Sequence, residues 1–206
     1  MSRRSTPRAR LGLGLATAGC LFVGLYAVAL TASGFRLLPP DVAANGLPLA
    51  LKVHVATAGV ALLLLPWQLW PALRRRVRWH RWLGRGYAVA AVAGGVSGTA
   101  AAVGTQAGPV AGTGFGVLGV LWTVSTVAAV LAARGGDPVA HRRWAVRSFA
   151  LAFAAVTLRL ELPLAAIAGV GLDVAYPAVA WWCWVPNLVV AEWWWGRRTS
   201  QEFATA

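Results

Sequence analysis

The stretch L-G-L-G-L-A-T-A-G-C-L-F-V-G-L-Y-A-V-A-L-T-A, residues 11–32, decides the fold class of this chain. Its 22 residues include no charged side chain. A helix rises about 1.5 Å per residue, so a run of this length crosses the hydrocarbon core of a bilayer, which is about 30 Å thick. The segment therefore predicts a transmembrane helix.

Five further runs of similar length and composition follow it. Of the 206 residues, 58% are hydrophobic and 12% are charged, whereas soluble chains carry about 25% charged residues. The runs are continuous and rich in Ala, Leu and Gly, unlike the alternating strands of a membrane barrel. We predict an all-α, polytopic membrane helix bundle with six transmembrane helices, at residues 11–32, 49–70, 82–103, 110–133, 144–170 and 174–195.

Sixteen of the 19 Lys and Arg residues lie before the first run, around the junction of the second and third, around the junction of the fourth and fifth, and after the sixth. The positive-inside rule places these segments, and therefore both termini, in the cytoplasm (N-in/C-in). The net charge of +13 is divided among clusters between apolar runs, which argues against nucleic acid as a partner. We expect a multi-pass protein of the cell (inner) membrane that contacts anionic lipid head groups at its cytoplasmic face.

The chain reads as one domain. Residues 1–10 form a basic cytoplasmic tail, 11–196 form the six-helix domain with its core spans at about 49–170, and 197–206 form a short cytoplasmic tail. The start also resembles a cleavable leader ending near Ala27-Val28-Ala29, but the uncharged run is long for a leader. The two cysteines, Cys20 and Cys183, fall at membrane depth, so we expect them to be buried and not to form a disulfide scaffold.

Small residues at four-residue spacing allow membrane helices to approach closely. Such stripes predict a tight hairpin of the third and fourth helices, and they occur at Ala90, Gly94, Gly98 and Ala102 and again at Gly108, Gly112 and Gly116. Gly114, Gly116 and Gly119 match G-x-G-x-x-G, but a dinucleotide site needs a preceding strand. We interpret this match as helix packing.

Two histidines open the third and fifth helices in similar settings. H-R-W-L-G-R-G-Y begins at His80, and H-R-R-W-A-V-R-S-F begins at His141. A parallel repeat of helix pairs would place both imidazoles at one cytoplasmic depth on different helices. That arrangement suits one haem b with His80 and His141 as iron ligands, while Arg81, Arg142 and Arg147 are available to pair with its carboxylates.

The alternative interpretation of these segments is structural. Arginine clusters orient membrane helices, and His and Trp are common at the membrane interface, where they contact lipid head groups. No Walker loop, H-E-x-x-H or nucleophile elbow occurs in the chain. A hydrolase or a nucleotide-driven pump is therefore disfavoured, and the sequence assigns no catalytic residue.

A second group of polar residues falls within the predicted spans: His54, Arg159 and Glu161 in the outer half, and Asn187 in the sixth span. A charge at that depth is costly unless it is paired. Arg159 and Glu161 are two residues apart and project from opposite sides of their helix, so we expect a partner for Arg159 from another helix. The group is either an ion pair that holds the fifth helix or a functional polar site. Pro186 before Asn187 predicts a kink in the sixth helix.

Four segments carry a resemblance to a known family: the two histidine segments at 80–87 and 141–150, T-L-R-L-E-L-P at 157–163 and W-V-P-N-L-V-V-A-E-W at 184–193. From about residue 49 to 195 the chain resembles the bacterial membrane proteins grouped as domain of unknown function 2306. That resemblance implies no established reaction. A weaker, architectural likeness is to four-helix b-type cytochromes of the b561 kind, which use two histidine pairs, whereas His54 has no outer partner here.

Three classes of function follow from these observations. The first is a membrane redox protein with one haem b near the cytoplasmic face. The second is a binder or transporter of a small or lipidic molecule, which would require an inward polar path. The third is an accessory subunit of a membrane complex, which has a membrane protein partner and no catalytic site of its own.

Overall fold

A computed structural model of the chain describes residues 7–38 and 47–204, with side chains placed for residue 7, 10–38 and 47–197. Arg3, Arg4 and Asn45 lie outside the described residues. Every regular element in the described part is a helix, and six helical segments are long and apolar enough to cross a membrane. The prediction of an all-α bundle with six spans is confirmed.

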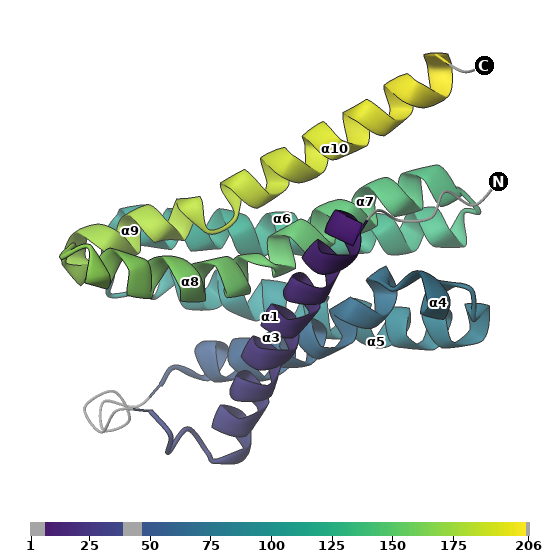
Figure 1. The fold of residues 1–206 in the computed structure, drawn as a ribbon. Coiled ribbons are helices and arrows are strands. Elements are labelled where there is room, and N and C mark those ends of the chain that lie inside the picture. Colours follow the sequence, from purple (N-terminus) through teal and green to yellow (C-terminus); the bar gives the residue numbers. More distant parts are fainter. Residues whose placement is uncertain (1–6, 39–46, 205–206) are drawn as a thin grey trace.

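The first four spans are continuous helices, and the fifth and sixth are each divided in two (Figure 1). The helices in chain order are α1 (Pro7–Ala32), α3 (Leu49–Leu69), α4 (Pro71–Arg74), α5 (Val77–Val103), α6 (Gly108–Arg134), α7 (Pro138–Ala152), α8 (Ala154–Ile167), α9 (Leu172–Trp182) and α10 (Val185–Ala204). The fifth span consists of α7 and α8, and the sixth of α9 and α10.

The bundle is built mainly from neighbouring pairs along the chain: α3 packs against α5, α5 against α6, and α6 against α7. α1 packs against α3, and α9 against α6 and α8. The buried core includes Leu65, Ala91, Trp122 and Leu151 from the central helices. It also includes both cysteines, which are fully buried and free, as predicted.

The kink in the sixth span lies where the proline indicated. Pro186 is the second residue of α10, a position at which its missing N–H costs no helical hydrogen bond. The side-chain amide of Asn187 donates to the carbonyl of Cys183 in the break and to the hydroxyl of Thr157 on α8, each over 2.9 Å. Both amide hydrogens are therefore used to hold the kink, and α10 turns away from the line of α9 (Figure 1).

The glycine contacts differ in part from the predicted hairpin. An added Cβ at Gly95 would lie 2.9 Å from the carbonyl of Gly119, and one at Gly119 would lie 2.8 Å from the carbonyl of Gly95. The closest approach of α5 and α6 is therefore at this pair. Gly98 instead faces α3, where an added Cβ would lie 2.6 Å from Nδ1 of His54. Stripe spacing alone did not distinguish the two neighbours of α5, because α5 packs between α3 and α6.

The G-x-G-x-x-G match serves packing, as interpreted from the sequence. An added Cβ at Gly114 would meet the carbonyl of Ala180 on α9 at 2.8 Å, and Gly119 faces α5. All three glycines lie inside α6, and Gly114 and Gly119 bring two other helices close to it.

The orientation in the membrane is our first testable prediction. α4 with the arginine-rich start of α5 and the junction of α6 with α7 lie at one end of the bundle, and the junction of α8 with α9 lies at the other (Figure 1). Reporter fusions after Arg78 and Gly136 are expected to read cytoplasmic, because arginine-rich segments stay inside. Fusions after Asn45 and Gly171 are expected to read exterior, and an exterior signal at Arg78 would overturn the assignment.

Candidate functional site

His80 on α5 and His141 on α7 line one cavity of about 770 Å³ near the arginine-rich end of the bundle. α3, α4, α6 and α10 also contribute to its walls. A volume in this range, about 300 to 1,000 Å³, is typical of pockets for cofactors and small molecules. The structure thus brings together the two histidines that the repeated sequence pattern singled out.

His141 is held in place by the local structure at the start of α7. The turn before it needs a positive φ of 75° at Gly136, which glycine adopts without a Cβ clash. Asp137 caps the helix by accepting hydrogen bonds from the N–H groups of Val139 and Ala140, and Pro138 occupies the first turn. His141 follows on the next residue, so its backbone position is defined by the cap.

The ring of His141 is also oriented. Its Nδ1 lies 2.8 Å from the carbonyl oxygen of Ala129 on α6. A carbonyl only accepts, so Nδ1 carries the hydrogen and Nε2 retains its lone pair. Histidines that bind metals commonly donate their second ring N–H to a carbonyl in this way.

His80 differs from His141 in having no partner for its inner nitrogen. Its Nδ1 is buried and makes no hydrogen bond with the described part of the chain. The ring lies within electrostatic range of His141 and of Arg74. The His80 imidazole is therefore a free polar group facing a cavity that a second imidazole shares.

Gln68 on α3 is a lining residue that the sequence reasoning did not assign to this site. Its side chain is 4% exposed, and its Nε2 has no hydrogen-bond partner among the described residues. It packs on α5 at Gly84, where an added Cβ would lie 3.2 Å from its Oε1. Gly84 is one turn beyond His80 on the same face of α5. The only signal in the sequence was a polar residue within the apolar run that ends α3.

Four side chains beside the cavity form a closed hydrogen-bond ring. Thr126 donates to the carbonyl of Trp122 over 2.8 Å, so the contact of 2.7 Å between Thr126 and Ser148 has Ser148 as donor. Tyr87 must then donate to Ser148 over 2.8 Å, and the indole of Trp122 donates to Tyr87 over 3.3 Å. All four hydrogens are used within the ring, which leaves these groups only lone pairs to offer a ligand.

The predicted arginines lie in three different settings. Arg142 lines the cavity together with Arg74, which the sequence reasoning did not select, and Arg81 is not among the lining residues. Arg147 is paired with Glu192 of α10 through both carboxylate oxygens, with 2.9 Å between Nη2 and Oε2, and its guanidinium stacks on Trp144. Arg147 therefore ties α7 to α10, which contributes Trp194 and Trp195 to the cavity.

Among the described residues, the lining of the cavity contains the two cationic side chains Arg74 and Arg142 and no carboxylate. No group of three or more His, Cys, Asp or Glu side chains gathers anywhere in the described part of the chain. The described ligands are therefore too few for a bare metal ion, but two histidines are enough for the iron of a haem, whose porphyrin supplies the other four ligands.

The outer polar residues do not form one site around Arg159. His54 contacts the carbonyl of Gly94 over 2.8 Å, and Arg159 donates to the carbonyl of Ala155, on its own helix, over 2.9 Å. The described hydrogen bond of Arg159 is thus within α8, where we had expected a partner from another helix. Tyr26 and His54 lie within electrostatic range of the guanidinium.

Glu161 and Asn187 lie apart from that guanidinium. Oε2 of Glu161 is buried without a hydrogen-bond partner in the described structure, and the carboxylate is within electrostatic range of Cys183. Asn187 has both its amide hydrogens committed at the kink. The opposite projection of Arg159 and Glu161 agrees with the absence of an ion pair between them among the described residues.

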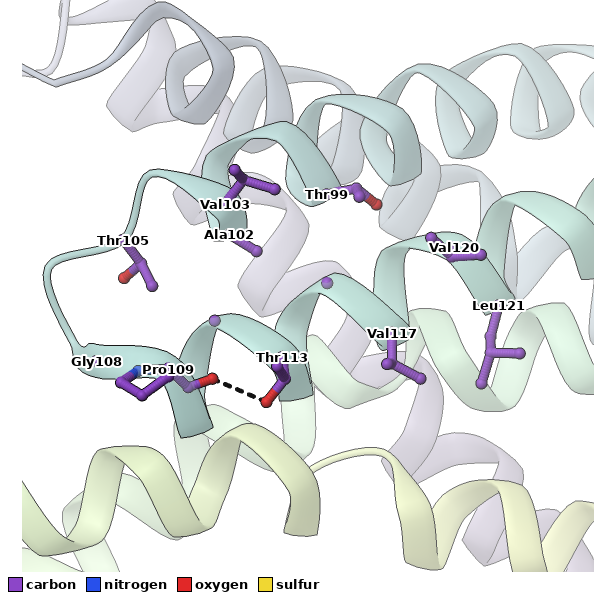
Figure 2. Close-up of a pocket in the computed structure, with 12 residues that line it drawn as sticks. Thr99, Ala102, Val103, Thr105, Gly108, Pro109, Thr113, Val117, Val120 and Leu121 are labelled. Atoms are coloured by element: carbon purple, nitrogen blue, oxygen red, sulfur yellow. Dashed lines mark hydrogen bonds between the residues drawn. The ribbon is translucent and has the colours of Figure 1, made fainter.

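A second pocket of about 680 Å³ lies at the other end of the α5–α6 hairpin (Figure 2). Its lining consists of small and apolar residues and three threonines, and Thr113 already donates to the carbonyl of Pro109 over 2.8 Å. The described lining offers no charged group, so this pocket has no evident chemistry beyond contact with lipid.

Comparison with protein families gives one match, to the predicted membrane protein family DUF2306, over residues 51–195. The chain belongs to this family. The matched region includes Gln68, both cavity histidines and the Arg147–Glu192 pair, so the cavity lies almost wholly within the part that defines the family. No curated protein and no solved structure matches, and the architectural likeness to b-type cytochromes gains no support from the comparisons.

Proposed function

We propose that this multi-pass membrane protein is a redox protein that binds one b-type haem between α5 and α7, where His80 and His141 would hold its iron. The observation that carries the proposal is the placement of two imidazoles from two helices on one cavity. The hydrogen bond from Nδ1 of His141 to Ala129 leaves Nε2 as the ligating atom of that ring.

The remaining lining suits the rest of a haem. Its porphyrin needs an apolar slot, which Leu69, Val130 and Phe149 help to supply, and its two carboxylates need cations. Arg74 and Arg142 are the cations of this lining. Guanidinium groups bind carboxylates through two parallel hydrogen bonds, which makes arginine well suited to this role.

The histidine count limits the redox role to one face of the membrane. The chain has three histidines, and the third, His54, contacts Gly94 in another part of the bundle. A second bis-histidine site would need a further imidazole beside it. A bound haem supplies one-electron chemistry, and with one site that chemistry takes place at the arginine-rich end.

We further propose that this end faces the cytoplasm, in the cell (inner) membrane, and contacts anionic lipid head groups. Exposed Trp82 and Trp193 stack with Arg85 and Arg197, with 5.2 and 4.0 Å between each guanidinium carbon and the ring centroid. Indoles at the interface beside cations favour anionic lipid.

A second candidate function is the binding of a small amphipathic molecule in the same cavity. The unpartnered Nε2 of Gln68 and the two arginines favour a ligand whose polar end carries acceptor oxygens. Trp194 and Trp195 would lie against its apolar part.

The absorbance spectrum of the full-length protein in mild detergent tests the haem proposal. We expect a Soret band, and a sharp α-band on reduction with dithionite, because two imidazoles give a six-coordinate iron. Protein isolated without haem is expected to acquire these bands when hemin is added. A spectrum with protein absorbance alone, before and after hemin, would leave the amphipathic ligand as the function of the cavity.

A further inference from the structure

Burial of the Gln68 side chain lowers the stability of the protein, because no hydrogen bond of its Nε2 in the described structure compensates for the loss of contact with water. Its Nε2 is an amide donor with no partner, within a side chain that is 4% exposed. A buried donor left without an acceptor is destabilising, so such groups in native proteins usually have a partner outside the protein chain. Gln68 lines the cavity, which is where such a partner would lie.

The neighbours of Gln68 are also donors. Arg74 and Arg142 line the same cavity, and guanidinium groups donate hydrogen bonds but cannot accept them. The hydroxyls of Tyr87, Thr126 and Ser148 use their hydrogens within the closed ring described above. The donors left for a ligand thus include this amide and two cations.

We infer that Gln68 donates a hydrogen bond from Nε2 to an anionic oxygen of the molecule that occupies the cavity, and that Arg74 and Arg142 balance its charge. The inference rests on the proposed function in its choice of cavity. A carboxylate of haem and a phosphate of an anionic lipid present the same kind of oxygen. Gln68 would then be a specificity-determining residue that selects an acidic ligand over its neutral counterpart.

Gly84 makes this placement possible. An added Cβ at Gly84 would lie 3.2 Å from Oε1 of Gln68, so a larger residue would displace the amide from α5. Oε1 lies near α5 at this glycine, and Nε2 makes no hydrogen bond with the described residues.

The test compares Gln68→Met with Gln106→Met in the full-length protein. Methionine keeps the length of the side chain and removes the donor, and Gln106 is an exposed residue of the α5–α6 turn. For Gln68→Met we expect the Kd for hemin to rise about tenfold, because a hydrogen bond to a charged oxygen is lost. We expect no rise for hemin dimethyl ester, whose carboxylates are blocked, and none for Gln106→Met with either probe.

The thermal stability of the ligand-free variant separates ligand binding from a structural role. Gln68→Met removes an unsatisfied amide, so its Tm without ligand is expected to equal or exceed that of the wild type. A lower Tm in Gln68→Met, with no change in its discrimination between hemin and the ester, would show that Gln68 is only structural and would overturn the inference.

A second experiment, in which lipid replaces hemin as the ligand, distinguishes failure of the inference from failure of the haem proposal. If hemin does not bind, nanodiscs of phosphatidylglycerol are expected to raise the Tm of the wild type above its value in phosphatidylcholine. That rise should be reduced in Gln68→Met and kept in Gln106→Met. Hemin bound equally by the wild type and Gln68→Met would leave the haem proposal intact and reject the role of Gln68. Where hemin does not bind, the haem proposal fails by itself, and equal effects of both lipids would then also reject the role of Gln68.

Discussion

His141→Ala is expected to abolish the six-coordinate haem spectrum and to weaken hemin binding by more than about 100-fold. Loss of a group that only orients a metal ligand already lowers metal affinity about 10- to 100-fold, and loss of the ligand itself should lower it further. The variant removes both the proposed ligand and the ring that Ala129 orients over 2.8 Å. His80→Ala is expected to have the same spectral effect, because each imidazole fills one axial position. The measurement is a hemin titration followed through the Soret band.

His54→Ala is the matched control for this experiment. The third histidine contacts Gly94 and does not line the cavity, so its loss is expected to leave the Soret band in place. A Soret band that survives in both His80→Ala and His141→Ala, or one that is lost only in His54→Ala, would contradict the assignment of the ligands.

Gly119→Ala is expected to destabilise the bundle by about 1 to 3 kcal/mol, the usual cost of overpacking. The new methyl group would lie 2.8 Å from the carbonyl of Gly95 and 3.1 Å from the N–H nitrogen of Thr99. These are backbone atoms of a neighbouring helix, so they can move only if α5 moves. Gly95→Ala meets the carbonyl of Gly119 at 2.9 Å and is expected to act in the same way.

Gly116→Ala provides the control on the same helix. Its added Cβ would lie 3.9 Å from that of Ala102, which is an ordinary van der Waals contact. Alanine has the higher helix propensity, so this variant is expected to be neutral or slightly stabilised. Thermal unfolding in detergent compares the three variants, and equal Tm values for Gly116→Ala and Gly119→Ala would show that α5 and α6 do not meet at the Gly95–Gly119 pair.

The candidate site was only partly predictable from sequence. His80 and His141 stood out because their segments repeat, and repetition survives in a sequence without any knowledge of contacts. Gln68 and Arg74 did not stand out, because one lies in an apolar run and the other in a cluster of six arginines within residues 74–85. Their relevance depends on lining the cavity, which no local pattern encodes.

The Arg147–Glu192 pair shows the same limit. The sequence suggested the carboxylates of a haem as the partner of Arg147, whereas Glu192 lies 45 residues later on another helix. Glu192 lies on α10, which begins at the kink beside Pro186 and turns away from α9 (Figure 1). The sequence predicts the kink, but it does not predict the direction of the helix that follows or the helix against which it packs.

The number of spans, the all-α class, the kinked sixth helix and the burial of both cysteines were determined by the sequence itself. Each follows from local physics: backbone polar groups in lipid must be satisfied within a helix, and proline cannot donate a hydrogen bond. Only the tertiary structure decided which glycines meet, which arginines line the cavity and where His54 and Arg159 point. Lipid is as apolar as most of these side chains, so hydrophobicity does not select the face of a membrane helix that turns inward, and close backbone contacts such as that of Gly95 with Gly119 make the choice.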